Sequence, residues 1–251
     1  MALTVKRAIG TVGYLGGLWS VPEPFMWSWT QMLEYNRDVL CQPGQYIKPE
    51  HALNSYHDLA RNELAGKMEG DWLMMFDADL VFDPDICARM VRMMYADPGG
   101  LDVLVGVYPY KSFPHYPILY VWNEELQGFE VMGSWDRSMN LIEIGSAGGG
   151  TLLVRKRVFD RIESELKEKP FDRLPLHPNA PGEGTFGEDH SFFMRLRRLG
   201  IKAYCAWQVQ AGHLKYEPIA LATHYRIKPA LHHSYELSGF KTAGREAKPI
   251  Q

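Results

Sequence analysis

The sequence has few cysteines, no excess of basic charge and no long apolar run. Its three cysteines, Cys41, Cys87 and Cys205, are widely spaced, so neither a disulfide framework nor a zinc knuckle is expected. We expect reduced thiols, which are typical of a cytosolic protein. A net charge of −3 disfavours binding to nucleic acid through a broad basic field, although it leaves room for a nucleic-acid acceptor held at a local patch.

Two further absences concern membranes and nucleotide hydrolysis. No stretch reaches the length of apolar residues that spans a bilayer, and the opening MALTVKRAIG lacks the apolar region and cleavage site of a signal peptide. We therefore expect a cytoplasmic protein without a transmembrane segment. The chain also has no G-x-x-x-x-G-K-[ST] motif, which argues against a P-loop hydrolase.

The first half of the chain alternates segments with strand-like and helix-like patterns. The order strand, helix, helix, strand, helix, strand is typical of an α/β protein with a central, mostly parallel sheet flanked by helices. The third of these helices is expected to have Asp83 as N-cap and Pro84 at its first position. In order, the segments are 5–12 (strand), 25–37 (helix), 51–68 (helix), 72–76 (strand), the helix after Asp83, and 101–107 (strand).

The second half has a more mixed pattern. YPILYVW and GFEVMG predict a hairpin around NEELQ, and LIEIGSAGGGTLLVRKRVFDRI predicts a strand, a glycine loop, a strand and a helix. Residues 169–187 are rich in Pro and Gly, and a loop of this length in a compact domain is often a lid or a binding loop. An amphipathic helix is expected over 189–199.

The stretch GDWLMMFDADLVFDPD, residues 70–85, is an apolar strand that ends in two carboxylates, Asp77 and Asp79. Two anions so close repel each other, and such an arrangement is usually kept for a cation, a phosphoryl group or a sugar phosphate. Ligands of α/β sheets bind beyond the carboxyl ends of the strands, which is where this pair is expected. The alternative is a solvated strand end, because D-x-D also occurs by chance.

Two later segments carry further candidate groups. Glu188 and Asp189, in FGEDHSFFMRLRRLG, lie at the start of a predicted helix, where the backbone dipole favours negative charge. They either cap the helix or provide a general base, and the dipole would keep that base ionised but weak. His213, in QAGHLKY, follows a strand candidate; a single His is more often structural, but imidazole with carboxylate and phosphate oxygens suits Mn²⁺.

Taken together, these segments resemble a family 2-type glycosyltransferase with the GT-A fold, and in particular the short soluble members common in bacteria and their phages. The resemblance covers residues 5 to about 214, and its segments follow the family's order. It implies one GT-A domain over 1–215, with a nucleotide-binding half (1–107), an acceptor and catalytic half (108–215), and a tail at 216–251 that packs on the domain or is flexible. The matching segments are AIGTVGY, HDLARNELAG, DWLMMFDADLVFDPD, GVYPYKSFP, GSAGGGTLLVRKRVF, FGEDHSFFMRLRRLG and AGHL.

The resemblance implies a donor, a metal and their ligands. The donor would be a nucleotide-diphosphate sugar, either a UDP-sugar or a GDP-sugar, and the metal Mn²⁺ or Mg²⁺. The implied metal site consists of Asp77, Asp79 and His213. Asp79 would bind the metal directly, Asp77 would lie beside it at the ribose or a metal-bound water, and His213 would be the second protein ligand. Arg61 and the loop after Thr11 would hold the nucleotide.

The resemblance also implies how the sugar is transferred. Asp189 would be the base of an inverting displacement, and Glu188 would lie beside it for the acceptor or the sugar. The glycines Gly148, Gly149 and Gly150 would let the backbone approach the donor sugar. Tyr108 and Lys111 are further candidates for the sugar pocket.

Several alternatives stay open at this point. The first loop, GTVGYLGGLWSVPEP, departs from the family's commoner P-x-Y-N opening, so the base-binding contacts are not assigned. A retaining GT-A transferase, a degenerate carbohydrate- or nucleotide-binding protein, and a haloacid dehalogenase-type phosphatase, whose D-x-D motif DADLV also fits, are the rivals. That phosphatase motif normally opens its chain, and the later G-D-x-x-x-D is missing here. The acceptor (glycan, lipid-linked sugar, protein or modified nucleic acid) and the oligomeric state are not readable from the sequence.

Overall fold

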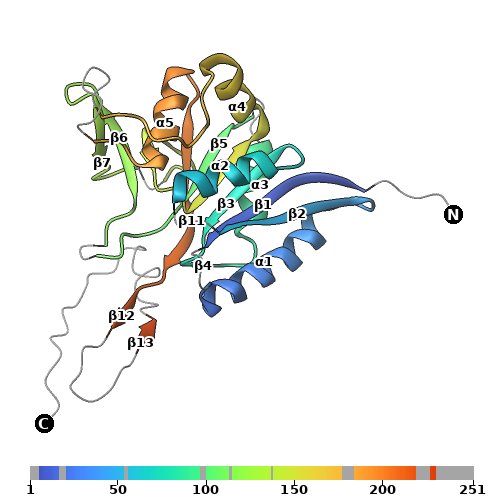
Figure 1. Ribbon diagram of the computed structural model, residues 1–251. Helices are drawn as coiled ribbons and strands as arrows, with labels where there is room; N and C mark the ends of the chain where they lie inside the picture. Colours follow the sequence, from blue (N-terminus) through green and yellow to red (C-terminus); the bar gives the residue numbers. More distant parts are fainter. Residues whose placement is uncertain are drawn as a thin grey trace, which may run out of the picture.

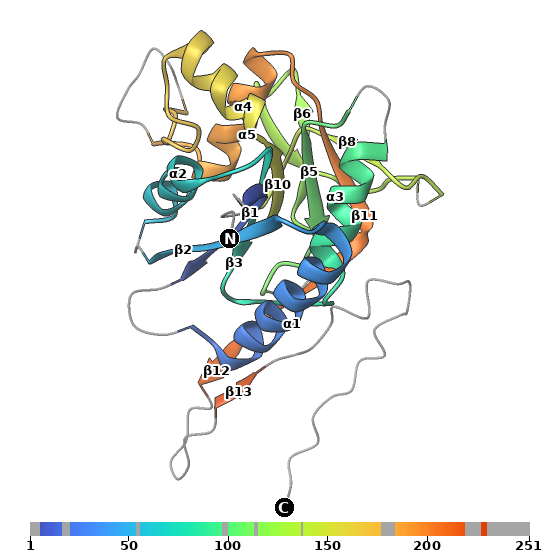
Figure 2. The ribbon, with the colours of Figure 1, turned by 90° about the vertical axis from the view of Figure 1, so that its right-hand side faces the viewer.

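The computed structural model describes a central sheet with helices packed on both of its faces (Figures 1 and 2). Helices α1 and α3 cover one face, and α2, α4 and α5 cover the other. None of the helices in the described part of the chain is long and apolar enough to cross a membrane. The described residues are 6–16, 21–53, 56–96, 100–112, 115–136, 138–176, 184–218 and 227–229.

The elements follow one another as strands and helices in a mixed order, which confirms the α/β class expected from the sequence. In chain order they are β1 (Arg7–Gly16), α1 (Glu23–Leu40), β2 (Gln45–Leu53), α2 (His57–Lys67), β3 (Trp72–Asp77), β4 (Leu80–Phe82), α3 (Ile86–Ala96), β5 (Val103–Val107), β6 (Leu119–Asn123), β7 (Gly128–Val131), β8 (Ile142–Ile144), β9 (Ser146–Ala147), β10 (Thr151–Arg155), α4 (Lys156–Arg161), the π-helix η1 (Ile162–Leu166), α5 (Glu188–Arg198), β11 (Ala203–His213), β12 (Tyr216–Pro218) and β13 (Ile227–Pro229).

The main sheet has the strand order β2-β1-β3-β10-β5-β11-β4, with β8 also paired to β11. Strand β1 is parallel to β2 and β3, and β5 is parallel to β11. Strand β10 runs antiparallel between β3 and β5. A smaller sheet of β7, β6 and β9 contains the predicted hairpin.

Strand β3 explains why its sequence is apolar throughout. Leu73 and Met75 enter the core under α2, α4 and α5, whereas Met74 and Phe76 enter the core under α1 and α3. All four side chains are fully buried. A strand that is covered on both faces needs apolar residues at every position, and each buried side chain contributes about 1.5–3 kcal/mol. The strand therefore holds its last residue, Asp77, at a fixed position where the carboxyl end of β3 leaves the sheet.

Some boundaries differ from those expected. Residues 51–53 belong to strand β2, not to a helix over 51–68, and α2 begins only at His57. The strand was missed because β2 is an edge strand, paired only with β1 and half-exposed, so it shows weak alternation and accepts Pro49. Helix α3 begins at Ile86, whose N–H donates to the Asp83 carbonyl, so Asp83 and Pro84 precede the helix.

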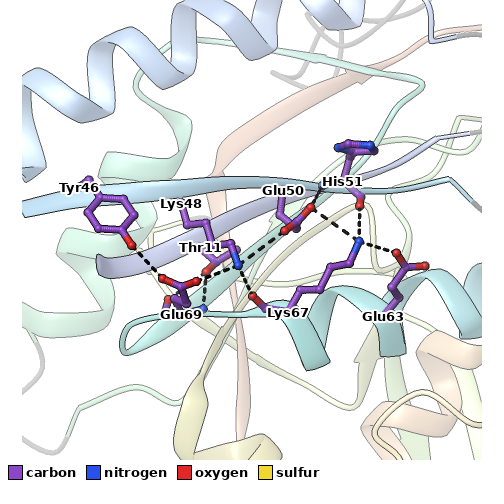
Figure 3. Close-up of polar contacts among 8 residues, drawn as sticks. All are labelled: Thr11, Tyr46, Lys48, Glu50, His51, Glu63, Lys67 and Glu69. Atoms are coloured by element: carbon purple, nitrogen blue, oxygen red, sulfur yellow. Dashed lines mark hydrogen bonds and ion pairs between the residues drawn. The ribbon is translucent and has the colours of Figure 1, made fainter. Parts of the chain in front are cut away.

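A polar network fastens the edge strand β2 to α2 and to the turn before β3 (Figure 3). Lys48 Nζ lies 3.0 Å from Glu69 and 3.6 Å from Glu50, and Lys67 Nζ lies 3.7 Å from Glu50. Exposed pairs of this kind contribute at most about 1 kcal/mol each. The charged Lys48 on this edge strand also opposes pairing with another chain's edge.

The predicted C-terminal tail is only partly described. The backbone of β12 pairs antiparallel with that of β13. The rest of 216–251 lies outside the described residues, as do residues 177–183 of the predicted 169–187 loop.

Candidate active site

Backbone pairing brings together Asp79 and His213, which are far apart in the sequence. Strand β4, which follows the acidic pair, is antiparallel to β11, so that His213 lies opposite Leu80. The N–H of Leu214 donates to the Asp79 carbonyl over 2.7 Å. As a result, His213 Nε2 lies 3.4 Å from Asp79 Oδ2. The other ring nitrogen, Nδ1, is 2.8 Å from the carbonyl of Pro109, which can only accept, so Nδ1 carries the proton.

The Asp79 carboxylate is held ionised by two cationic or donor neighbours. Burial alone raises the pKa of Asp79, but His213 and Lys111 outweigh it and bring that pKa to about 2. Lys111 Nζ contacts the same oxygen, Oδ2, that faces His213. The other oxygen, Oδ1, is buried without a hydrogen-bond partner in the described part of the chain. A carboxylate with one oxygen unpartnered and the other facing an imidazole nitrogen is a donor set that suits a divalent cation.

The described residues do not form a complete metal cage. Within them, no three or more His, Cys, Asp or Glu side chains are grouped so that they could hold a metal ion. Asp79 and His213 are a pair, and Asp77, the third predicted ligand, is engaged elsewhere. A cation bound by the pair would therefore complete its shell with water and substrate oxygens, as Mg²⁺ commonly does.

Arg61, on α2, contacts three other segments of the site: the end of β3, the glycine loop and the start of α5. The guanidinium is buried, with 1% of the residue exposed. Its Nη2 donates to Asp77 Oδ1 over 2.8 Å, its Nη1 donates to the Gly149 carbonyl over 2.8 Å, and its Nε lies 3.5 Å from Glu188 Oε1. Burial alone would lower the pKa of Arg61, but Asp77 and Glu188 raise it above its usual value. Arg61 thus links α2 to the end of β3, the glycine loop and the start of α5.

The glycine loop packs directly on Arg61 and Tyr108. A Cβ on Gly149 would lie 2.5 Å from Arg61 Cζ, and a Cβ on Gly150 would lie 2.9 Å from Asp77 Oδ2. Tyr108 Oη accepts a hydrogen bond from the N–H of Gly150 over 2.9 Å. The same oxygen is so close to Gly148 that a Cβ on this glycine would lie 2.2 Å from it. These glycines are therefore required by packing inside the protein, whatever else they contact. The Tyr108 ring also meets His213 edge-on, with ring centroids 5.4 Å apart.

The two acids at the start of α5 have opposite electrostatic environments. Burial raises the pKa of Glu188, but His57 and Arg61 outweigh it and bring that pKa to about 2. Glu188 Oε1 lies 3.6 Å from His57 Nδ1. In contrast, burial raises the pKa of Asp189 above its ordinary value. Two neighbouring carboxyl groups whose pKa values are driven apart are suited to different roles, and Asp189 is the stronger base.

Two histidines near the acids were not predicted as site residues. His57, at the start of α2, pairs with Glu188, and this contact raises the pKa of His57. His190 Nδ1 lies 2.7 Å from Ser146 Oγ, and its ring stacks on Phe129 with centroids 4.8 Å apart. The only sequence signal for His190 was its position next to the acidic pair. Nothing in the local pattern linked His57 to Glu188, because the two are far apart in the chain.

The structure does not bring Thr11 to this site. Strand β1 continues past Thr11 to Gly16, and it is Leu15 that lies opposite Asp77. Thr11 Oγ1 donates to the Glu69 carbonyl over 2.9 Å and accepts the Glu69 N–H over 2.7 Å. The expectation that a nucleotide-binding loop follows Thr11 is therefore wrong in position, because the chain there is still a buried strand. Residues 17–20, which follow β1, lie outside the described residues.

We expect Thr11→Val to destabilise the fold without weakening nucleotide binding. The substitution keeps the shape but leaves the N–H and C=O of Glu69 without this partner, which costs about 1–3 kcal/mol. Chemical denaturation measures the loss, and Thr30→Val, at an exposed helix position, is the control that should stay within about 0.5 kcal/mol of the parent. Unchanged stability combined with lost nucleotide affinity would instead return Thr11 to the ligand site.

Comparisons with known proteins agree with this architecture. Residues 38–162 match the family described as Glycosyl transferase family 2. The structure of GalNAc-T7 with UDP, GalNAc and Mn²⁺ is 12% identical, covers 84% of this chain and 44% of that one, and has a TM-score of 0.51, which indicates a shared fold. No curated protein matches the chain.

Two further solved structures are similar at lower TM-scores. A197 from STIV is 19% identical over 89% of this chain and 99% of its own, with a TM-score of 0.44. The inositol-1-phosphate CTP transferase from T. maritima is 10% identical over 83% of this chain and 89% of its own, with a TM-score of 0.41.

Proposed function

Because the chain belongs to glycosyl transferase family 2 over residues 38–162 and is a glycosyltransferase with the GT-A fold, we propose that it catalyses a metal-dependent, inverting transfer. A sugar would pass from a nucleotide-diphosphate sugar to an acceptor hydroxyl. The observation that carries this proposal is the pairing of Asp79 with His213 at the edge of the sheet where β3 ends, together with a half-buried acid, Asp189, whose pKa is raised. Membership of this family also favours a glycosyltransferase over the haloacid dehalogenase-type phosphatase.

Asp79 and His213 are the residues that would hold Mn²⁺ or Mg²⁺. A divalent cation bound there supplies positive charge that stabilises the diphosphate leaving group of a UDP- or GDP-sugar. Asp77, held by Arg61, is proposed to lie next to the nucleotide at the ribose or a metal-bound water rather than to bind the cation directly. The presence of UDP and Mn²⁺ in the GalNAc-T7 structure supports this choice of donor and metal classes.

Asp189 is proposed as the general base of a single displacement. It would take the proton of the acceptor hydroxyl while that oxygen bonds to the anomeric carbon and the bond to the diphosphate breaks. A carboxylate with a raised pKa is a better proton acceptor, so burial counteracts the weakening effect of the helix dipole. Glu188 stays ionised beside it, held by Arg61 and His57, and is available to the acceptor or the sugar.

The halves of a single domain over 1–215 would divide this work. In this proposal residues 1–107 supply Asp77 and Asp79, and residues 108–215 supply His213 and Asp189. The interleaving of β10 and β11 with β3 and β5 in one sheet supports a single unit.

A panel of nucleotide sugars, each with and without Mn²⁺, tests the proposed function. We expect one donor to raise the melting temperature selectively and only with metal, since a ligand at 100 times its Kd stabilises a protein by about 2.7 kcal/mol. The same donor should be slowly hydrolysed, chelation should stop the hydrolysis, and added Mn²⁺ should restore it. Undiminished turnover in excess chelator would contradict the metal requirement, and a flat response to all donors would contradict the transferase assignment.

A further inference from the structure

Lys111 lies where it can compete with a cation at Asp79. It follows β5 in a loop that begins with Tyr110, whose N–H donates to the Tyr116 carbonyl over 2.9 Å. Its Nζ contacts Asp79 Oδ2, the oxygen that also faces His213 Nε2. The two side chains are partly open to solvent, with 44% of Lys111 and 35% of Asp79 exposed. The ammonium is therefore neither locked in place by burial nor far from the proposed metal ligands.

An ammonium and a divalent cation cannot share this carboxylate oxygen without repulsion. Divalent cations bind carboxylate oxygens at about 2.0–2.6 Å, so a cation on Asp79 Oδ2 would need the place beside this oxygen that the Lys111 ammonium occupies. A lysine side chain is a compact charge on a flexible stem, so it can leave when a stronger cation arrives. His213 needs no such movement, because its Nδ1 is already fixed by Pro109 and its Nε2 already faces Asp79.

We propose that Lys111 is the internal counter-ion of Asp79 in the metal-free protein and is exchanged for the divalent cation when the site is loaded. This inference rests on the proposed function, because it concerns the same metal site. Lys111 thereby lowers the affinity of the site for free metal. The displaced ammonium is then available to the diphosphate of the donor, so that metal and donor favour each other's binding.

The direct test compares Mn²⁺ binding by the full chain and by Lys111→Met, without nucleotide, from the electron paramagnetic resonance signal of free Mn²⁺. We expect Lys111→Met to bind Mn²⁺ about fivefold more tightly, which is the affinity equivalent of an exposed ion pair worth up to about 1 kcal/mol. Lys202→Met is the matched control, since Lys202 pairs with Glu143 at 2.8 Å and is 62% exposed. Its Mn²⁺ affinity should equal that of the parent, and Asp79→Asn should lose the site.

A second measurement follows the lysine itself. The rate at which Lys111 is acetylated by a small amine-specific reagent, measured by mass spectrometry, should increase when Mn²⁺ is added to the parent protein. It should not respond to Mn²⁺ in Asp79→Asn, and the acetylation of Lys202 should not respond in either protein. Melting temperatures confirm that each variant is folded.

The outcomes separate this inference from the proposed function. Equal or weaker Mn²⁺ binding by Lys111→Met, in a chain whose parent binds Mn²⁺ and hydrolyses a nucleotide sugar, overturns the exchange and leaves the transferase assignment intact. Absence of Mn²⁺ binding in both proteins overturns the exchange together with the metal site. Tighter binding by Lys111→Met supports the exchange, even when no donor has yet been found.

Discussion

Replacing Asp189 by asparagine should lower the rate of glycosyl transfer by about 10²- to 10⁴-fold, the range expected when a general base is removed. Asparagine has the same shape but cannot accept the acceptor proton, so the affinity for the donor should change little. Initial rates with the donor identified by the nucleotide-sugar panel measure the first effect, and isothermal titration with that donor measures the second.

The pH profile adds an independent check on Asp189. A base works only when deprotonated, so kcat/KM should fall as pH drops through the pKa of Asp189, which burial holds above the usual aspartate value. This acidic limb should be missing from the residual activity of Asp189→Asn. Asp160→Asn, an exposed helix position paired with Lys156, is the control that should keep both the rate and the limb. Normal turnover by Asp189→Asn would remove Asp189 from the role of base.

Replacing Arg61 by methionine should cost about 3–5 kcal/mol of unfolding free energy, because it leaves the carboxylates of Asp77 and Glu188 without their buried cation. Domains of this kind are usually stable by only about 5–15 kcal/mol, so the loss is a large fraction of the total. Urea denaturation followed by far-UV circular dichroism measures it.

The control for Arg61 is an exposed arginine that pairs with one carboxylate. Arg157 pairs with Asp102, and 54% of its side chain is exposed, so Arg157→Met should cost less than about 1 kcal/mol. Arg61→Lys should fall between the two, because lysine keeps the charge but its compact ammonium does not span the three acceptors that the planar guanidinium reaches. If Arg61→Met kept full stability and lost only nucleotide affinity, Arg61 would be a nucleotide ligand, as the family resemblance implies.

The sequence was sufficient for the class of fold and for the strand that ends at the acidic pair. Strand β3 is buried on both faces, so its apolar run was unambiguous, and the change to Asp77 marked its end. The edge strand β2 was missed because a half-exposed strand has no such signal. Local patterns thus identify buried elements more readily than peripheral ones.

The arrangement of the candidate site depends on contacts between distant parts of the chain, which local patterns do not encode. That Asp79 faces His213 follows from the pairing of β4 with β11, whereas Asp77 turns to Arg61 on α2. The spacing of Asp77 and Asp79 in the sequence gave no reason to expect that their side chains would have different partners. Likewise, the difference between Glu188 and Asp189 comes from His57, Arg61 and burial, and not from their order in the sequence.

The central position of β10 has a consequence for how the chain is synthesised. Strands β3 and β5 do not pair with each other, because β10, residues 151–155, fills the space between them. A nascent chain that has left the ribosome only as far as β5 therefore exposes one unpaired edge of β3 and both edges of β5, and such apolar strand edges invite aggregation. The sheet formed by the first hundred residues is therefore completed only after the glycine loop and β10 have emerged.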